Sequence, residues 1–284
     1  MGFKQNYRII KRVICILFLI PAISGCSFAG KIWYERLDIY LANYFFKYAE
    51  FSPDQKAYVR YTTKQYQQWN KNSELPKYKN LIVEISQLTG RSISTEDVKK
   101  IFDKGELLFQ DSNNFFTPHI VSFCKTLNDK QVEEINLFFE KRIEGWRESL
   151  KESKDQSQEE STTESEQRLA KFLGVRLDDK QLENIKDLAK EIKNEDTSSI
   201  ERQDTWNKEL ITILREKDFQ NFNFLLTDHL SSLLDSEQRG NREAVYHEII
   251  ATTIASLNEV QRKKFERRLN VFVSSLDKII KNHN

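Results

Sequence analysis

One phrase recurs along this chain, and it is built like the first turn of a helix. "LNDKQVEEI" begins at Leu127 and its near-copy "LDDKQLENI" begins at Leu177, while looser versions begin at Phe51, Ile93 and Leu257. In each version an apolar residue precedes a side chain that favours the N-cap position, because its oxygen accepts a hydrogen bond from an orphan backbone N–H. The predicted caps are Ser52, Ser94, Asn128, Asp178 and Asn258.

The residues that follow the caps indicate long helices. In four copies a glutamine stands three positions after the cap, which is the reciprocal half of a capping box. Apolar residues then step by three or four along 132–150 and 265–279, as on one face of an amphipathic helix. Turn-forming residues are scarce, with 8 Gly and 4 Pro in 284 residues, and no stretch alternates as a strand does. We expect an all-α fold, an elongated bundle of about nine to eleven amphipathic helices.

A polar segment divides the chain. Residues 151–168 contain no apolar side chain, so we expect a linker or the protruding end of a helical hairpin there. It separates an N-terminal helical half at 26–150 from a C-terminal helical half at 169–284. The caps Ser52 and Asn128 lie 76 residues apart, and Asp178 and Asn258 lie 80 apart. A duplicated unit would explain these spacings, and so would a shared way of starting helices.

The N-terminus predicts a cellular address. Four basic side chains precede an apolar run at 13–23 that is too short for a comfortable membrane span. Small residues then lead to Cys26 in "ISGCS", which resembles the lipobox of bacterial lipoproteins. An ordinary secretory signal with a coincidental cysteine is the alternative. We expect a signal peptide at 1–25, lipidation of Cys26 and, because Ser27 follows, attachment to the outer membrane with the protein facing the periplasm.

Composition and motifs exclude several kinds of site. Removal of residues 1–25 leaves 40 Lys and Arg against 43 Asp and Glu, so we expect no nucleic-acid partner. The chain has no glycine-rich phosphate loop, and His119, His229, His247 and His283 are scattered. We therefore predict no catalytic residue, no metal site and no cofactor. Cys124 lies in an apolar run, which favours a buried, inert thiol.

The segment from Tyr58 to Tyr78 is unusually rich in aromatic and amide side chains. Such side chains stack on sugar rings or grip a peptide, but the simpler interpretation is aromatic residues packed in the core with their hydroxyls at its rim. At its end, "SELPKY" predicts a new helix capped by Ser73 with Pro76 in its first turn.

The longer run from Tyr34 to Tyr78 resembles the opening of a family of bacterial lipoproteins known as domain of unknown function 6279. The family pattern of Tyr-x-x-Leu-Asp, a glutamine-bearing helix start, a tryptophan and Glu-Leu-Pro-x-Tyr corresponds here to Tyr34, Leu37, Asp38, Gln55, Trp69, Glu74, Leu75, Pro76 and Tyr78. The likeness extends over nearly the whole chain. Asn70 and Lys71 stand where the family usually has His-Arg. The resemblance therefore implies a structural or recognition role for the segment and no known activity.

These observations predict a non-enzymatic, lipid-anchored envelope protein with a partner-binding, scaffold or chaperone-like role. Its expected contacts are the membrane, through the anchor, and an envelope protein or a glycan. The alternative is an enzyme, or an enzyme accessory, acting on peptidoglycan or another glycan. In that case Trp69, Glu74 and Tyr78 would line a cleft.

Overall fold

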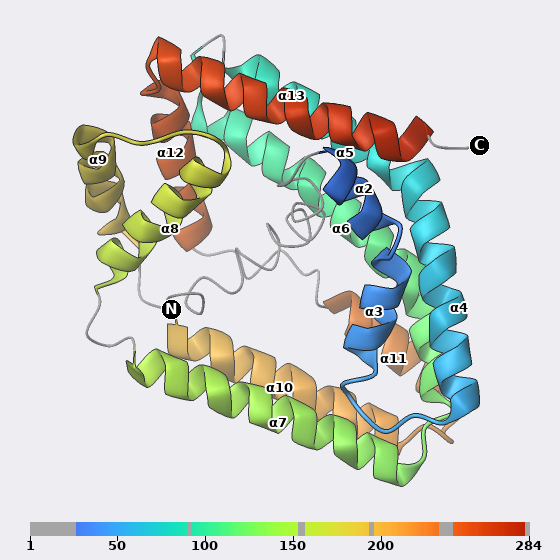
Figure 1. The fold of residues 1–284 in the computed structure, drawn as a ribbon. Coiled ribbons are helices and arrows are strands. Elements are labelled where there is room, and N and C mark those ends of the chain that lie inside the picture. The colour runs from blue at the N-terminus through green and yellow to red at the C-terminus, as the bar shows by residue number, and fades with distance from the viewer. Residues whose placement is uncertain (1–26, 90–91, 153–156, 193–195, 233–240, 282–284) are drawn as a thin grey trace.

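In a computed structural model, the helices of this chain run along the sides of a four-sided frame (Figure 1). The structure describes residues 27–89, 92–152, 157–192, 196–232 and 241–281. These residues are predominantly helical and include no strand, which confirms the all-α prediction. The predicted signal peptide and Cys26 lie outside the described residues. No helix within the described ranges combines the length and the apolar character needed to span a bilayer.

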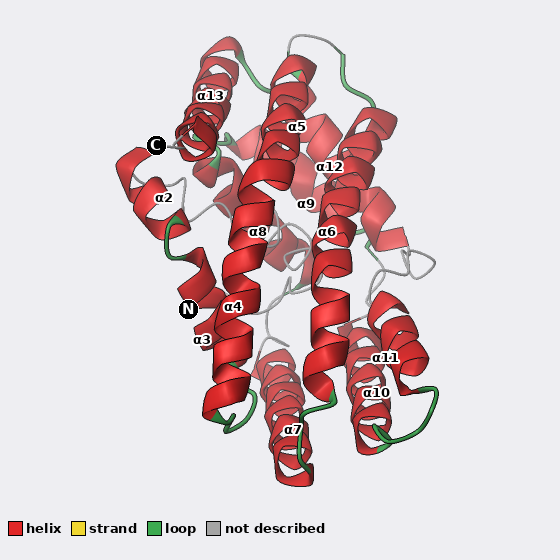
Figure 2. Cartoon of the chain, turned by 90° about the vertical axis from the view of Figure 1, so that its right-hand side faces the viewer, coloured by secondary structure: helices red, strands yellow, loops and turns green. Residues whose placement is uncertain are grey.

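One side of the frame is a long helix with an irregular middle. Helix α4 (Pro53–Trp69) continues through a π-helical turn, η1 (Asn70–Glu74), into α5 (Leu75–Leu88). Helix α6 (Thr95–Cys124) lies beside it, while α2 (Ser27–Tyr34) and α3 (Leu37–Phe45) lie along one edge of this side (Figure 2). With α4, η1 and α5 taken as one helix, the described residues form eleven helices, within the expected range.

The lower side of the frame, as seen in Figure 1, is an antiparallel helix pair. Helix α7 (Asp129–Glu152) packs along α10 (Asp196–Arg215). Two ion pairs show that the helices are antiparallel, since Arg147 lies 2.9 Å from Asp204 and Arg215 lies 2.9 Å from Glu133. Helix α11 (Phe222–Ser231) joins this pair to α6.

The remaining helices complete the frame. Helices α8 (Gln158–Phe172), α9 (Asp179–Ala189) and α12 (Asn241–Ala255) form the left side, and α13 (Glu259–Lys281) lies across the top (Figure 1). Helix α13 runs antiparallel to α5, as shown by hydrogen bonds from Lys79 to Asp277 and from Thr89 to Glu266, both 2.7 Å long. The polar segment 151–168 falls on the end of α7, on undescribed residues and on most of α8, where Thr162 is fully buried.

Two apolar cores hold the frame together. We name them from their positions in Figure 1. The upper core takes side chains from α2, α5, α8, α9, α12, α13 and the first half of α6. The lower core takes them from α4, α7, α10, α11 and the end of α6. Helix α3 contributes to both cores, through Leu37 and Ala42 respectively. Both cores therefore combine helices from before and after 151–168, so this segment does not separate one core from the other.

Each core contains a reciprocal glutamine pair that ties two helix starts together. In the lower pair, Gln55 Nε2 donates to Gln131 Oε1 at 3.1 Å and Gln131 Nε2 donates to Gln55 Oε1 at 2.7 Å. In the upper pair, Gln181 and Gln261 exchange the same two bonds at 3.1 and 2.9 Å. We call these the lower and upper clasps.

The clasps match in their remaining bonds as well. Each glutamine Oε1 accepts from the backbone N–H of its own cap residue, and each Nε2 donates to the backbone carbonyl two residues before its partner's cap. The four caps are Ser52, Asn128, Asp178 and Asn258, and the four carbonyls belong to Glu50, Thr126, Arg176 and Ser256. The fifth cap, Ser94, forms a capping box with Asp97 and has no glutamine. The recurring phrase thus starts helices and, in four copies, also pairs them.

Candidate functional site

The Glu-Leu-Pro-x-Tyr motif lies where the long helix passes from the lower core to the upper core. Residues 70–74 form the π-helical turn, in which the Leu75 N–H donates to the Asn70 carbonyl five residues earlier. Ser73 lies inside this turn and starts no helix, so the prediction of a new helix capped by Ser73 is wrong. Pi turns inside α-helices are rare and occur frequently at functional sites, which makes this segment the leading candidate.

Pro76 gives a physical reason for the π turn. Proline has no N–H, and its ring clashes with the carbonyl four residues earlier when it stands inside a regular α-helix. A wider turn immediately before Pro76 moves that carbonyl away, so the helix continues where the sequence predicted a stop and a restart. Helices α4 and α5 therefore join without a break, because their buried side chains pack in the two cores and keep the helices aligned.

Four polar or amphipathic side chains point inward at four-residue steps along this segment. Asn70 and Glu74 are buried to 1% and 0% exposure, Tyr78 to 7%, and Tyr66 is half-buried. Residues four apart drift by about 40° around an α-helix at each step. The wider π turn offsets part of that drift, so the stripe stays on the side that faces α2 and α6.

Tyr34 fastens α2 to this stripe. Its hydroxyl lies 2.8 Å from Asn70 Oδ1 and 3.1 Å from the Gln67 carbonyl, so one proton is shared between two acceptors. Gln67 Nε2 in turn donates to the Tyr34 carbonyl. Burial, followed by the neighbouring Tyr66 and Tyr78 hydroxyls, raises the pKa of Tyr34 well above its ordinary value. Tyr34 therefore remains a neutral hydrogen-bond donor throughout the physiological range.

Glu74 links the same turn to α6. Its Oε1 accepts from Lys77 Nζ at 2.8 Å, and Lys77 also reaches Asp111 Oδ2 at 2.8 Å. These hydrogen bonds, Asp111 first, raise the pKa of Lys77. Glu74 Oε2 is buried and has no hydrogen-bond partner among the described residues. Burying a carboxyl oxygen without a hydrogen-bond partner costs free energy of folding. An apolar side chain would fill the position of Glu74 without this cost.

Trp69 belongs to an aromatic cluster between α4 and α6. Its ring stacks on Phe115 with centroids 4.9 Å apart, and it lies 5.6 Å from Tyr66. The other aromatics of the Tyr58–Tyr78 segment do not form one surface. Tyr58 packs against Phe123 in the lower core, whereas Tyr61 is 60% exposed. The segment therefore links helices inside the protein and does not form one aromatic surface.

We call this arrangement the joint: the π turn with its bonds to α2, through Tyr34 and Asn70, and to α6, through Glu74, Lys77 and Asp111. Of these five residues, the sequence patterns singled out Tyr34 and Glu74 and gave no role to the others. Asn70 was noted only as a departure from the family pattern. Lys77 and Asp111 gave no local signal, because their pairing depends on how α5 and α6 pack.

The other predicted residues lie near the joint or apart from it. Asp38 is half-buried in the first turn of α3, and Leu75 is fully buried in the upper core. Cys124 is buried in the lower core, and burial raises the pKa of its thiol to about 12. Within the described ranges, no group of three His, Cys, Asp or Glu residues is placed to hold a metal ion.

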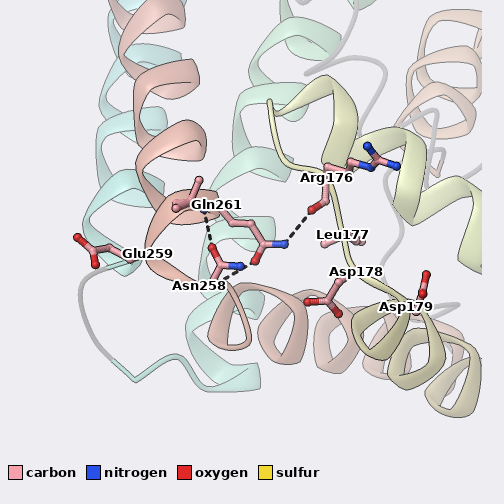
Figure 3. Close-up of a pocket in the computed structure, with 8 residues that line it drawn as sticks. Arg176, Leu177, Asp178, Asp179, Asn258, Glu259 and Gln261 are labelled. Carbon is pink, nitrogen blue, oxygen red and sulfur yellow. Dashed lines mark hydrogen bonds between the residues drawn. The ribbon is translucent and has the colours of Figure 1, made fainter.

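Two surface pockets lie away from the joint. One overlies the upper clasp, where the starts of α9 and α13 meet (Figure 3). Asp178, Asn258 and Gln261 line it, and their side chains already bond within the helix caps and the clasp. The other is lined by residues of the turn between α10 and α11, together with Lys125. Neither pocket includes Trp69, Glu74 or Tyr78, so neither is the cleft that the glycan alternative requires.

The described residues form an all-α protein whose long helix contains a proline-bearing joint. This architecture by itself indicates no reaction. A family model narrows this further, because DUF6279, a family of unknown function, matches residues 47–239. The chain belongs to this family, which confirms the resemblance. The match includes the π turn and three clasp glutamines, and leaves Tyr34, Asp38 and Gln261 outside. No curated protein and no solved structure shows significant similarity to the chain.

Proposed function

We propose that this protein is a lipid-anchored scaffold of the bacterial envelope, held on the outer membrane by acyl chains on Cys26 and facing the periplasm. In this proposal it acts by holding a rigid helical body at the membrane, where an envelope partner binds. The support for the address is the basic segment, the apolar run and the small residues before Cys26.

The observation that carries the scaffold role is the position of Tyr34. It lies eight residues after Cys26, at the end of the helix that begins directly after the anchor. Its buried hydroxyl bonds to the π turn, and α2 also packs on α13. A protein that needs only a tether has no use for such a connection, because a flexible linker serves as well. A fixed connection instead makes the orientation of α2 set the orientation of the whole frame.

The proposed anchor predicts the outcome of one substitution. Cys26→Ala removes the acylated thiol, so labelling with an alkyne fatty acid is expected to fall to background and the protein to leave the membrane fraction. Cys15→Ala and Cys124→Ala are matched controls, because they remove the other two cysteines of the chain and are expected to change neither result. Acyl labelling that persists in Cys26→Ala would contradict the anchor.

A further inference from the structure

The first two helices expose an apolar and aromatic face beside the expected anchor. Among the described residues, eleven large apolar side chains are exposed, and four of them lie in α2 and α3. They are Ile32, Ile39, Tyr40 and Tyr44, which are 41%, 51%, 43% and 45% exposed. Single exposed apolar side chains are common on proteins, whereas a cluster of them marks an interaction surface. We call this cluster the anchor face.

The composition of α3 indicates that something covers this face. Its sequence, "LDIYLANYF", is apolar nearly all round, a pattern typical of a helix that is buried on every side. Leu37 and Ala42 are buried, and α3 packs mainly against α4, whereas Ile39, Tyr40 and Tyr44 are exposed. Figure 2 shows α2 and α3 along the edge of the long helix, with no other helix drawn outside them. Among the described residues, the side of α3 that carries Ile39, Tyr40 and Tyr44 therefore stays exposed, although its sequence is typical of a covered helix.

The polar atoms around the anchor face suit a lipid surface. Trp33 stacks on Tyr40 with ring centroids 5.6 Å apart, and the Tyr44 hydroxyl accepts from Arg142 at 2.8 Å. Tryptophan and tyrosine concentrate at membrane interfaces because each combines an apolar ring with a polar tip. Residues 27–49 also carry three basic side chains against two acidic ones, whereas the mature chain is acidic overall. One of them, Lys47, lies 5.7 Å from the centre of the Tyr44 ring, and a basic side chain there favours the anionic headgroups of a bacterial leaflet.

The expected acyl anchor on Cys26 places the bilayer next to this face. Cys26 directly precedes α2, and a helix rises about 1.5 Å per residue, so Ile32 lies roughly 8 Å along the helix from its start. If acyl chains on Cys26 enter the leaflet, α2 begins at the headgroups. A protein partner would then have to displace lipid from a surface that the anchor itself holds against the membrane. This argument favours lipid over protein as the occupant.

We propose that the anchor face of α2 and α3 lies in the headgroup region of the leaflet that holds the acylated Cys26. This inference rests on the proposed anchor and adds to it, because acyl chains alone fix a point whereas a seated helix face fixes an orientation. The joint then carries this orientation from α2 into the frame.

The test uses the lipidated protein in vesicles of phosphatidylethanolamine and phosphatidylglycerol. A polarity-sensitive fluorophore is attached at Ile39→Cys or, as the matched control, at Val260→Cys, an apolar position that is 63% exposed at the start of α13. Cys124 is buried and Cys26 is acylated, so the introduced thiol is the one that reacts. We expect a blue shift and strong quenching by headgroup-region doxyl lipids at Ile39→Cys, and neither at Val260→Cys.

A second variant separates the face from the anchor. Tyr40→Asp places a charge on the face, and the label at Ile39→Cys is expected to lose most of its quenching while the protein stays acylated and vesicle-bound. An acylated, vesicle-bound protein whose Ile39→Cys label behaves as in water would overturn the inference and leave the anchor intact. So would shielding seen in native envelopes and absent from pure lipid vesicles, which identifies a protein occupant. Absence of acylation would instead overturn the proposed function.

Discussion

Replacing Gln131 with alanine is expected to lower the free energy of unfolding by about 2–3 kcal/mol, because the lower clasp loses one of its two halves. Gln131 donates to Gln55 Oε1 and to the Glu50 carbonyl, and accepts from Gln55 and from the Asn128 N–H. The side chain is 4% exposed, so water does not replace these bonds freely. Chemical denaturation monitored by circular dichroism measures the change. The matched control is Gln65→Ala, an exposed glutamine whose loss is expected to cost less than about 0.5 kcal/mol.

A double-mutant cycle sharpens this prediction. Gln55→Ala and Gln131→Ala are expected to be strongly non-additive, with a coupling of about 1 kcal/mol or more, because each change removes the same reciprocal bonds. Gln131→Ala and Gln261→Ala belong to different clasps and are expected to be additive. Additive losses at Gln55 and Gln131 would mean that these glutamines act only as separate helix caps.

Replacing Leu75 with alanine is expected to cost about 2–5 kcal/mol, the range for a large apolar side chain removed from a packed core. Leu75 is 0% exposed and lies directly after the π turn, in contact with the upper core. The surrounding helices hold the long helix in line through the turn, so they have little freedom to fill the cavity. Thermal or denaturant unfolding of Leu75→Ala gives the value.

Leu107→Ala is the matched control for this experiment. Leu107 lies on α6 and is 58% exposed, so the same truncation removes few contacts and is expected to cost well under 1 kcal/mol. A similarly small loss at Leu75→Ala would show that the residues around the π turn are loosely packed. It would remove the physical basis for treating the joint as rigid.

The helix starts could be predicted from the sequence because they depend on neighbouring residues. A cap, its glutamine three positions later and the apolar residue before it interact within one turn, and the structure contains capping bonds at Ser52, Asn128, Asp178 and Asn258. The same local signals predicted the all-α class. They could not predict that Gln55 pairs with Gln131 or Gln181 with Gln261, because these contacts join residues 76 and 80 positions apart.

Local capping does not require this tertiary pairing. The two halves of the chain therefore begin helices with the same phrase, and each half pairs two of these helix starts through the same glutamine bonds. Whether they arose by duplication stays a prediction, but the matched bonds to Thr126 and Ser256, and to Glu50 and Arg176, are what a repeated unit would produce.

The joint was predictable only in part. The sequence drew attention to Tyr34, Trp69, Glu74 and Tyr78, but the local rules for Ser73 and Pro76 predicted a helix start where the chain forms a π turn. Capping rules describe a helix end in water, whereas this segment lies between two cores that hold both flanking helices. Tertiary packing therefore overrides the local preference, and the same packing brings Lys77 and Asp111 to Glu74.

If the joint holds α2 rigidly on the frame, the distance between α2 and α6 takes one value, and a distance measurement tests this rigidity. Spin labels at Ile32→Cys on α2 and Leu107→Cys on α6 occupy exposed positions, and pulsed electron-spin resonance reports the distribution of distances between them. We expect one narrow distribution in the purified protein. It should broaden strongly in Tyr34→Ala, less in Tyr34→Phe, and not in the exposed-tyrosine control Tyr61→Ala. A broad distribution in the unaltered joint, or no change in Tyr34→Ala, would contradict the claim.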